Sequence, residues 1–195
     1  SLTKRRKSLT LFAGAAYHGS VFLSLGFSMF IAHLPAGYIC GKNLQQMFAK
    51  AGAPVKIFML AAIVGGIAPD LDMFYFYLID NRQTHHHMYW PHYPSVWLAL
   101  LAASGAWLYF AKQKSNAALA CIFSISGCIH LLLDTVVGDV FWLAPISFQP
   151  FSFFTVPSVY KPWWLNFILH WSFLLELFIV FFAVFIFRRN RTAAG

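Results

Sequence analysis

The chain alternates long apolar runs with short polar breaks. The run at 33–49 is the weakest, because polar residues interrupt it between 42 and 46. It fits a helix packed inside a bundle, whereas most of the others are long enough to cross the ~30 Å hydrocarbon core of a bilayer as helices. The pattern predicts an all-α, polytopic membrane helix bundle of about five to six helices. The runs are 9–31, 33–49, 55–79, 95–111, 117–134 and 163–187.

The longest break, residues 135–162, is expected to be a loop. It contains Pro145, Pro150, Pro157 and Pro162, and proline removes a backbone donor and breaks helices. No internal repeat divides the chain, so residues 1–195 are expected to form a single integral-membrane domain. Met29 could be a start in relatives, which would make residues 1–28 an N-terminal extension.

Composition supports the membrane interpretation. The chain is 59% hydrophobic and only 10% charged, with a mean hydropathy of +0.64, whereas soluble domains carry roughly 25% charged residues. The net charge of +8 comes from basic residues that flank the runs in small groups. Such groups meet anionic lipid headgroups, so membrane lipids are the expected partners and nucleic acid is not.

The basic residues also predict an orientation. If the N-terminus is cytoplasmic and the six runs alternate, twelve of the fourteen Lys and Arg residues lie inside, and only Arg82 and Lys161 lie outside. This asymmetry is what the positive-inside rule requires. We therefore expect an inner (cytoplasmic) membrane protein with both termini in the cytoplasm.

This topology gathers metal-capable side chains in one layer. Seven of the eight histidines and three of the six acids fall at the outer face. Scattered polar residues would not do this by accident, so we expect a metal site there. The candidate ligands are His33, Asp70, Asp72, His85, His86, His92, His130 and Asp134.

Two pairs of candidates have informative spacing. His130 and Asp134 are four residues apart, which puts both on one helix face within reach of one ion; the alternative is a structural hydrogen bond. Asp70 and Asp72 follow Pro69, which disfavours a helical conformation just before it. If this segment is extended, both carboxylates point the same way and could act as metal ligands or as a general base. The alternative is that they cap a helix in a solvated turn.

The histidines of the segment 85–92 need to be ranked, because three adjacent histidines cannot all bind one ion from a regular element. His85 and His92 are the first choices, and His86 is next. A set of His and Asp ligands suits a borderline metal such as Zn²⁺. Mn²⁺ and Fe²⁺ are alternatives, because no thiolate is in the set.

Two further charged residues are candidates for roles in the site or the membrane. Arg82 could hold a phosphate oxygen in a bidentate contact; the alternative is an ion pair with Asp80 or Asp139. Glu176 is expected near the middle of the last span, roughly 20 Å along its helix from the outer end. At that depth Glu176 is a candidate for a functional role; the alternative is that it makes a buried hydrogen bond to a neighbouring helix.

The order of these motifs resembles that of a known family, the membrane-bound, metal-dependent hydrolases whose founding members are described as LexA-regulated. The resemblance covers about residues 30–154 and implies an integral membrane protein that hydrolyses its substrate with a bound metal ion. The family usually carries His-Arg-Gly-x-Thr-His-Ser at the third motif, where this chain reads Asn81-Arg82-Gln83-Thr84-His85-His86, with the leading His replaced and the Gly missing. The matching strings are AHLPAG, APDLD, NRQTHHH, HLLLD and WLAPISFQPF.

A more remote resemblance is to zinc-dependent phospholipase C and the P1-type nucleases, which are all-helical enzymes that hold up to three zinc ions. Those enzymes complete their cluster with a His-x-x-x-Glu motif, but His170 and Glu176 are six residues apart. A helix would rotate them away from each other, so we expect one or two ions. The residues that fall in the order of those enzymes' ligands are His33, Asp70 or Asp72, His85, His130 and Asp134.

These observations favour a membrane-embedded metal-dependent hydrolase of the phosphoesterase type. Its catalytic residues would be Asp70, Asp72 and Arg82, and its substrate a phosphoester of a lipid or another small amphiphile at the outer face. The alternative is a metal-binding transporter or sensor without catalysis. A di-iron enzyme of the histidine-box type is disfavoured, because the chain lacks repeated His-x-x-His-His boxes.

Overall fold

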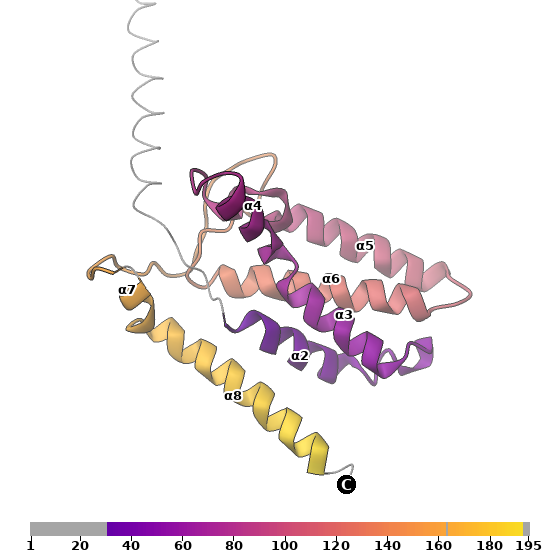
Figure 1. Ribbon diagram of the computed structural model, residues 1–195. Coiled ribbons are helices and arrows are strands. Elements are labelled where there is room, and N and C mark those ends of the chain that lie inside the picture. Colours follow the sequence, from indigo (N-terminus) through magenta and orange to yellow (C-terminus); the bar gives the residue numbers. More distant parts are fainter. Residues whose placement is uncertain (1–30, 163, 193–195) are drawn as a thin grey trace, which may run out of the picture.

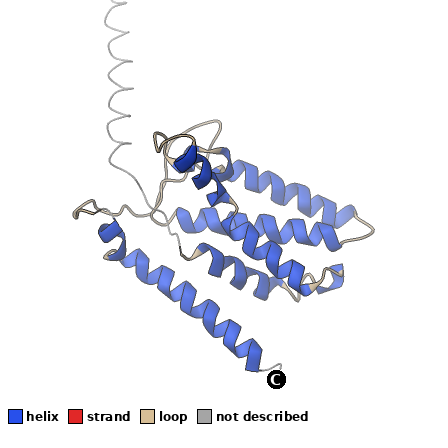
Figure 2. Cartoon of the chain, in the orientation of Figure 1, coloured by secondary structure: helices blue, strands red, loops and turns tan. Residues whose placement is uncertain are grey.

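The structure, a computed structural model, describes residues 31–162 and 164–192. Within them the chain forms seven α-helices and no named strand (Figure 2), which confirms the all-α prediction. Nearly all of the first predicted run, 9–31, and the whole of the expected extension, 1–28, lie outside the described residues. The helices are α2 (His33–Leu44), α3 (Val55–Ile67), α4 (Asp72–Leu78), α5 (Pro94–Phe110), α6 (Ser115–Asp134), α7 (Trp164–Ile168) and α8 (Trp171–Thr192).

Two described helices are long and apolar enough to cross a membrane. They are α6 and residues 171–190 of α8, and the bent pair of α3 with residues 69–78 makes a third if it counts as one span. Helix α5 is apolar but has 17 residues, and the 12 residues of α2 reach only about 18 Å at 1.5 Å per residue. The shortness of α2 agrees with its predicted place inside the bundle.

Helix α6 is the centre of the bundle and packs against α2, α3 and α5 (Figure 1). Small residues allow the close approach. A Cβ atom added to Gly65 of α3 would lie 2.2 Å from the carbonyl oxygen of Phe123, and one added to Gly127 of α6 would lie 2.0 Å from the Trp97 ring of α5. Glycine at these positions therefore brings helices from distant parts of the sequence into direct contact.

The third predicted run is broken where the sequence has Pro69. A short 3₁₀ helix, η2 (Pro69–Leu71), separates α3 from α4, and the two arms differ in direction by 59°. The extended conformation considered for Asp70 and Asp72 is therefore not the one that the chain adopts. Proline is well tolerated in the first turn of a helix, where its missing N–H is not needed, so the chain turns here without becoming extended.

The last predicted run is also broken, between α7 and α8. Helix α8 begins at Trp171, so Glu176 lies roughly 7.5 Å along it at 1.5 Å per residue. The sequence-based placement of Glu176 about 20 Å from the end of one continuous helix is therefore wrong. The glutamate lies near the start of α8, and it is fully buried.

Residues 135–162 form the predicted loop, which folds back against the C-terminal end of α6. Val140 and Phe151 form an isolated antiparallel bridge. The backbone N–H of Phe153 donates to the carbonyl oxygen of Thr135, 2.8 Å away. These bonds fix the loop beside Asp134, the last residue of α6.

Candidate metal centre

Eight buried or half-buried His and Asp side chains converge where four parts of the chain meet. These parts are the start of α2, the bend between α3 and α4, the segment that connects α4 to α5, and the end of α6. The connecting segment carries two short 3₁₀ helices, η3 (His86–Met88) and η4 (Trp90–His92). The converging residues are His33, Asp70, Asp72, His86, His87, His92, His130 and Asp134.

The predicted pair on α6 lies at the heart of this cluster. Nε2 of His130 is 3.0 Å from Oδ2 of Asp134, as their spacing of four residues on one helix face requires. The other oxygen of Asp134, Oδ1, is 3.2 Å from Nε2 of His33, the first residue of α2. The carboxylate of Asp134 therefore faces histidines from two different helices.

Asp70 extends the same arrangement from the α3–α4 bend. Its Oδ2 is 3.4 Å from Nδ1 of His33, and its Oδ1 is 3.6 Å from Nε2 of both His92 and His130. The Asp70 side chain is 20% exposed, while the side chains of its three histidine partners are at most 1% exposed. Asp70 is thus the point where this part of the cluster opens to its surroundings.

The connecting segment contributes His86, His87 and His92. Nε2 of His87 and Nε2 of His92 each lie 3.7 Å from Oδ2 of Asp134. Nδ1 of His86 lies 3.9 Å from Oδ1 of Asp72. The 3₁₀ turns of η3 and η4 aim these rings inward, although all three residues belong to a loop.

Three of the histidines are oriented by acceptors behind their rings. Nδ1 of His130 is 2.7 Å from the carbonyl oxygen of Gly66, and Nδ1 of His87 is 2.9 Å from that of Asp139. A carbonyl oxygen only accepts, so Nδ1 carries the proton in both rings. His92 makes the equivalent contact with Oδ2 of Asp72 at 2.5 Å.

In His87 and His130 this tautomer leaves Nε2 with a lone pair that can bind an ion. Nε2 of His87, His92 and His130 is buried without a hydrogen-bond partner among the described residues. A buried polar atom without a partner is costly. Histidines that bind metal ions usually have this arrangement, with one ring nitrogen held by a carboxylate or carbonyl and the other free for the ion.

The protonation of the loop histidines follows from their surroundings. Burial, with the neighbouring His92 and His85, lowers the pKa of His86 to about 3. Burial likewise lowers the pKa of His87 well below its usual value. Burial also acts to lower the pKa of His92, but the carboxylates of Asp70, Asp72 and Asp134 that face its ring outweigh burial and raise the pKa to about 9. His86 and His87 are therefore neutral at pH 7, the form that binds metal.

The donor atoms fall into three overlapping sets that could each hold a metal ion. Within each set, the ligand atoms lie within 4.8 Å of one another. Two sets share His92 and two share His130, so the cluster is continuous. Imidazole nitrogens with carboxylate oxygens suit Zn²⁺ and related divalent ions. The sets are His33 with Asp70 and His130; His92 with His130 and Asp134; and His86 with His87 and His92.

The three sets contain six of the eight ligands proposed from the sequence, and both Asp72 and His85 lie outside them. Asp72 instead contacts Nδ1 of His92. Nδ1 of His85 instead accepts the backbone N–H of His87 at 3.2 Å and caps η3. His87, which was not among the sequence candidates, takes a place in the cluster. No sequence signal separates adjacent histidines, because the 3₁₀ turn and the carbonyl oxygen of Asp139 together decide which ring points inward.

Arg82 lies apart from these sets. Its guanidinium is 5.7 Å from the centre of the Tyr77 ring, and the residue is exposed. The carboxylates suggested as alternative partners are engaged elsewhere. Asp80 accepts the backbone N–H groups of Gln83 and Thr84, and a carboxylate oxygen of Asp139 accepts the hydroxyl of Ser152.

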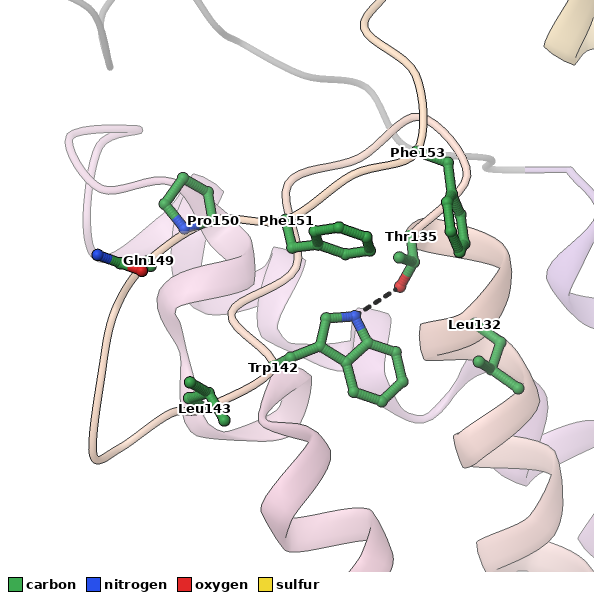
Figure 3. A pocket seen from close by; sticks show the side chains of 8 residues that line it. All are labelled: Leu132, Thr135, Trp142, Leu143, Gln149, Pro150, Phe151 and Phe153. Atoms are coloured by element: carbon green, nitrogen blue, oxygen red, sulfur yellow. Dashed lines mark hydrogen bonds between the residues drawn. The ribbon is translucent and has the colours of Figure 1, made fainter.

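An apolar pocket of about 420 Å³ lies beside the end of α6 (Figure 3). The indole N–H of Trp142 donates to the hydroxyl of Thr135 across it, at 3.0 Å. Leu132 lies about 200° around the helix from His130 at 100° per residue, so the pocket and the metal cluster occupy different faces of α6. The residues that line the pocket are Leu132, Thr135, Trp142, Leu143, Gln149, Pro150, Phe151 and Phe153.

Comparison with known proteins gives one family. The family model described as YdjM inner membrane protein matches residues 29–193, which include every residue of the cluster. No curated protein and no solved structure matches the chain significantly.

Proposed function

The chain belongs to the YdjM inner membrane protein family, and we propose that its buried cluster is the active site of a membrane-embedded, metal-dependent hydrolase. The proposed substrate is a phosphoester of a lipid or another amphiphile. The metal is most consistent with zinc, as one or two ions.

One observation carries the proposal, namely the three buried Nε2 atoms of His87, His92 and His130 that converge beside the carboxylate of Asp134. Each ring is held from behind by an acceptor, so the rings are aimed before any ion arrives. A cluster that served only stability would be expected to satisfy these nitrogens within the protein. A divalent cation satisfies them and neutralises the carboxylates at the same time.

Residues of the chain itself would orient the ligands, accept a proton and hold the substrate. When bound, the ion would supply Lewis-acid polarisation of the scissile bond and activation of a water molecule. Asp72 holds His92 in place through Nδ1. Asp70 is the more open carboxylate, so it is the better placed to accept a proton from the attacking water. Arg82 would hold a phosphate oxygen only after leaving the Tyr77 ring.

The position of the cluster in the fold favours an amphiphilic substrate. Asp70 and Asp72 lie at the break of a candidate span, and Asp134 is the last residue of another. Exposed apolar side chains, among them Leu71 and Phe74, follow Asp70 on the chain. Twelve of fourteen basic residues lie on the opposite side in the proposed topology, so the site would face away from the cytoplasm.

The test is a paired measurement of metal and turnover on the purified full-length protein. Metal would be counted by elemental analysis, and activity followed with bis-p-nitrophenyl phosphate and with a fluorescent phospholipid in mixed micelles. His130→Ala and Asp134→Ala should each lose most bound metal and most activity. The loss in affinity should exceed the roughly 10–100-fold that removal of an orienting partner costs. Ser104→Ala, which removes a buried hydroxyl bonded within α5, is the control and should keep both.

The outcomes separate the candidate functions. Metal that is lost in both variants, together with hydrolysis by the wild-type protein, supports the hydrolase. Bound metal without hydrolysis of either ester would favour a transporter or sensor. Full metal content in both variants would place the site elsewhere and refute the proposal.

A further inference from the structure

His33 differs from His87 and His130 in how it is held. Among the described residues no backbone carbonyl accepts from its ring, whose Nδ1 lies 3.4 Å from Asp70 and whose Nε2 lies 3.2 Å from Asp134. Two carboxylates face the ring, but no backbone carbonyl fixes its orientation, so the backbone conformation of His33 has a larger part in placing it. His33 is the first residue of α2, so the conformation of the chain entering this helix decides where the imidazole lies.

The start of α2 lacks the usual means of fixing that conformation. The residue before it, Ala32, has no side chain that can cap the helix, and the first turn contains no acidic residue. The first N–H groups of a helix have no partner within the helix. A Ser, Thr, Asp or Asn at this point normally satisfies one of them.

Glu176 of α8 supplies a carboxylate to the segment that enters α2, where it binds an N–H that precedes the helix and not one of the unpaired N–H groups of the first turn. Its Oε2 accepts the backbone N–H of Ile31 at 2.8 Å, across 145 residues of sequence. The residue is fully buried within a candidate membrane span, where an acidic side chain is costly and calls for a specific role. A negative charge near the N-terminus of α2 also interacts favourably with the helix dipole.

Apolar packing surrounds this hydrogen bond. Ala32 and Val137 form a small buried cluster, against which Leu175 and Ile179 of α8 pack on either side of Glu176 in sequence. Otherwise α8 lies at the edge of the bundle, with α2 and α7 as its main helix neighbours (Figure 1). The contact through Glu176 therefore joins this peripheral span to the chain that enters His33.

We infer that Glu176 is a positioning residue of the metal centre, which acts through the Ile31 N–H to hold His33 in place for the ion. The inference rests on the proposed function, because it requires that His33 bind metal. It assigns no direct contact between Glu176 and the ion. It also gives the peripheral helix α8 a part in the site, since α8 carries the carboxylate.

The experiment measures the affinity of the purified full-length protein for Zn²⁺ by competition with a chromophoric chelator. Glu176→Leu should weaken affinity by roughly 10–100-fold, the usual cost of removing a group that orients a metal ligand. Glu176→Gln keeps an oxygen that can accept from Ile31 and should retain affinity within about threefold. Ser172→Ala, one turn earlier on the same buried face of α8, is the matched control and should match the wild type.

A double-mutant cycle distinguishes positioning from a general loss of structure. If Glu176 acts through His33, then adding Glu176→Leu to His33→Ala should cause little further loss, because the ligand it positions is already gone. Glu176→Ala serves in the same cycle if the leucine variant is not recovered from membranes.

Each result bears on a different claim. Additive losses in the cycle, or an equal loss in Ser172→Ala, would overturn the positioning role. Unchanged Zn²⁺ affinity in Glu176→Leu would also overturn the positioning role. The hydrolase proposal would stand in that case, because the wild-type protein would still bind Zn²⁺. No Zn²⁺ binding by the wild-type protein would overturn both.

Discussion

At the scale of single residues, the cluster shows how neighbouring histidines acquire different roles. His85 and His87 are two positions apart, yet the ring of His85 caps a 3₁₀ turn while that of His87 faces Asp134. The carbonyl oxygen of Asp139 decides this difference, because it holds Nδ1 of His87 and turns Nε2 toward the carboxylate.

This contrast predicts opposite effects of two alanine substitutions. His87→Ala should weaken Zn²⁺ affinity by at least tenfold, because it removes an oriented ring nitrogen from the cluster. His85→Ala should change affinity by less than about threefold, since its ring lies outside the ligand sets. Chelator competition on both purified variants measures this directly. The reverse order of effects would mean that the loop adopts another conformation when metal binds.

At the scale of the helices, the site depends on close packing between α2, α3, α5 and α6. Three residues of the cluster, His33, Asp72 and Asp134, are the terminal residues of α2, α4 and α6, so a small displacement of one helix changes the distances between donor atoms. Glycines at the contacts make this packing possible. Gly66 serves twice, because its carbonyl oxygen also orients His130.

Substitution of these glycines should therefore destabilise the bundle. In Gly65→Ala the new methyl group would lie 2.2 Å from a backbone oxygen of α6, and the overpacking should cost roughly 1–3 kcal/mol. Gly105→Ala is the matched control in α5, because a Cβ atom there meets no atom within 4 Å. Thermal unfolding in detergent should show a lower midpoint for Gly65→Ala alone. Equal midpoints for the two variants would contradict this packing.

At the scale of the whole molecule, the proposed function depends on which side of the membrane the cluster faces. The cluster lies at the end of α6 remote from the α5–α6 connection (Figure 1). The loop that contains Gln83 and the loop that contains Gln113 should therefore lie on opposite sides. Both residues are exposed, so each can report on its side.

The expected orientation can be tested with a thiol at either position. In a protein whose native cysteines are replaced, Gln83→Cys should react with a membrane-impermeant maleimide in intact spheroplasts, whereas Gln113→Cys should react only after lysis. The asymmetry of the basic residues is the physical reason for this expectation. Labelling of Gln113→Cys alone in intact spheroplasts would reverse the topology and move the proposed substrate to the cytoplasmic side.

The features that the sequence determined by itself are those set by local periodicity and composition. Apolar runs predicted most of the helices, because burial in lipid or in a core needs a continuous apolar segment. The spacing of four residues was enough to place His130 beside Asp134, because a helix repeats every 3.6 residues. The proline-rich composition predicted the loop at 135–162 for a similarly local reason.

The tertiary structure alone decided the features that depend on contacts between distant segments. It selected His87 over His85 through a carbonyl oxygen 52 residues away, and it brought Asp70 and Asp72 to the cluster through a 3₁₀ bend. It also broke the last run before Trp171 and set Glu176 against the start of α2, 145 residues away along the chain. Every residue has the same backbone carbonyl, so the sequence does not show which carbonyl will orient a ring. Contacts between residues so far apart follow no regular spacing along the chain, so a single sequence does not predict them.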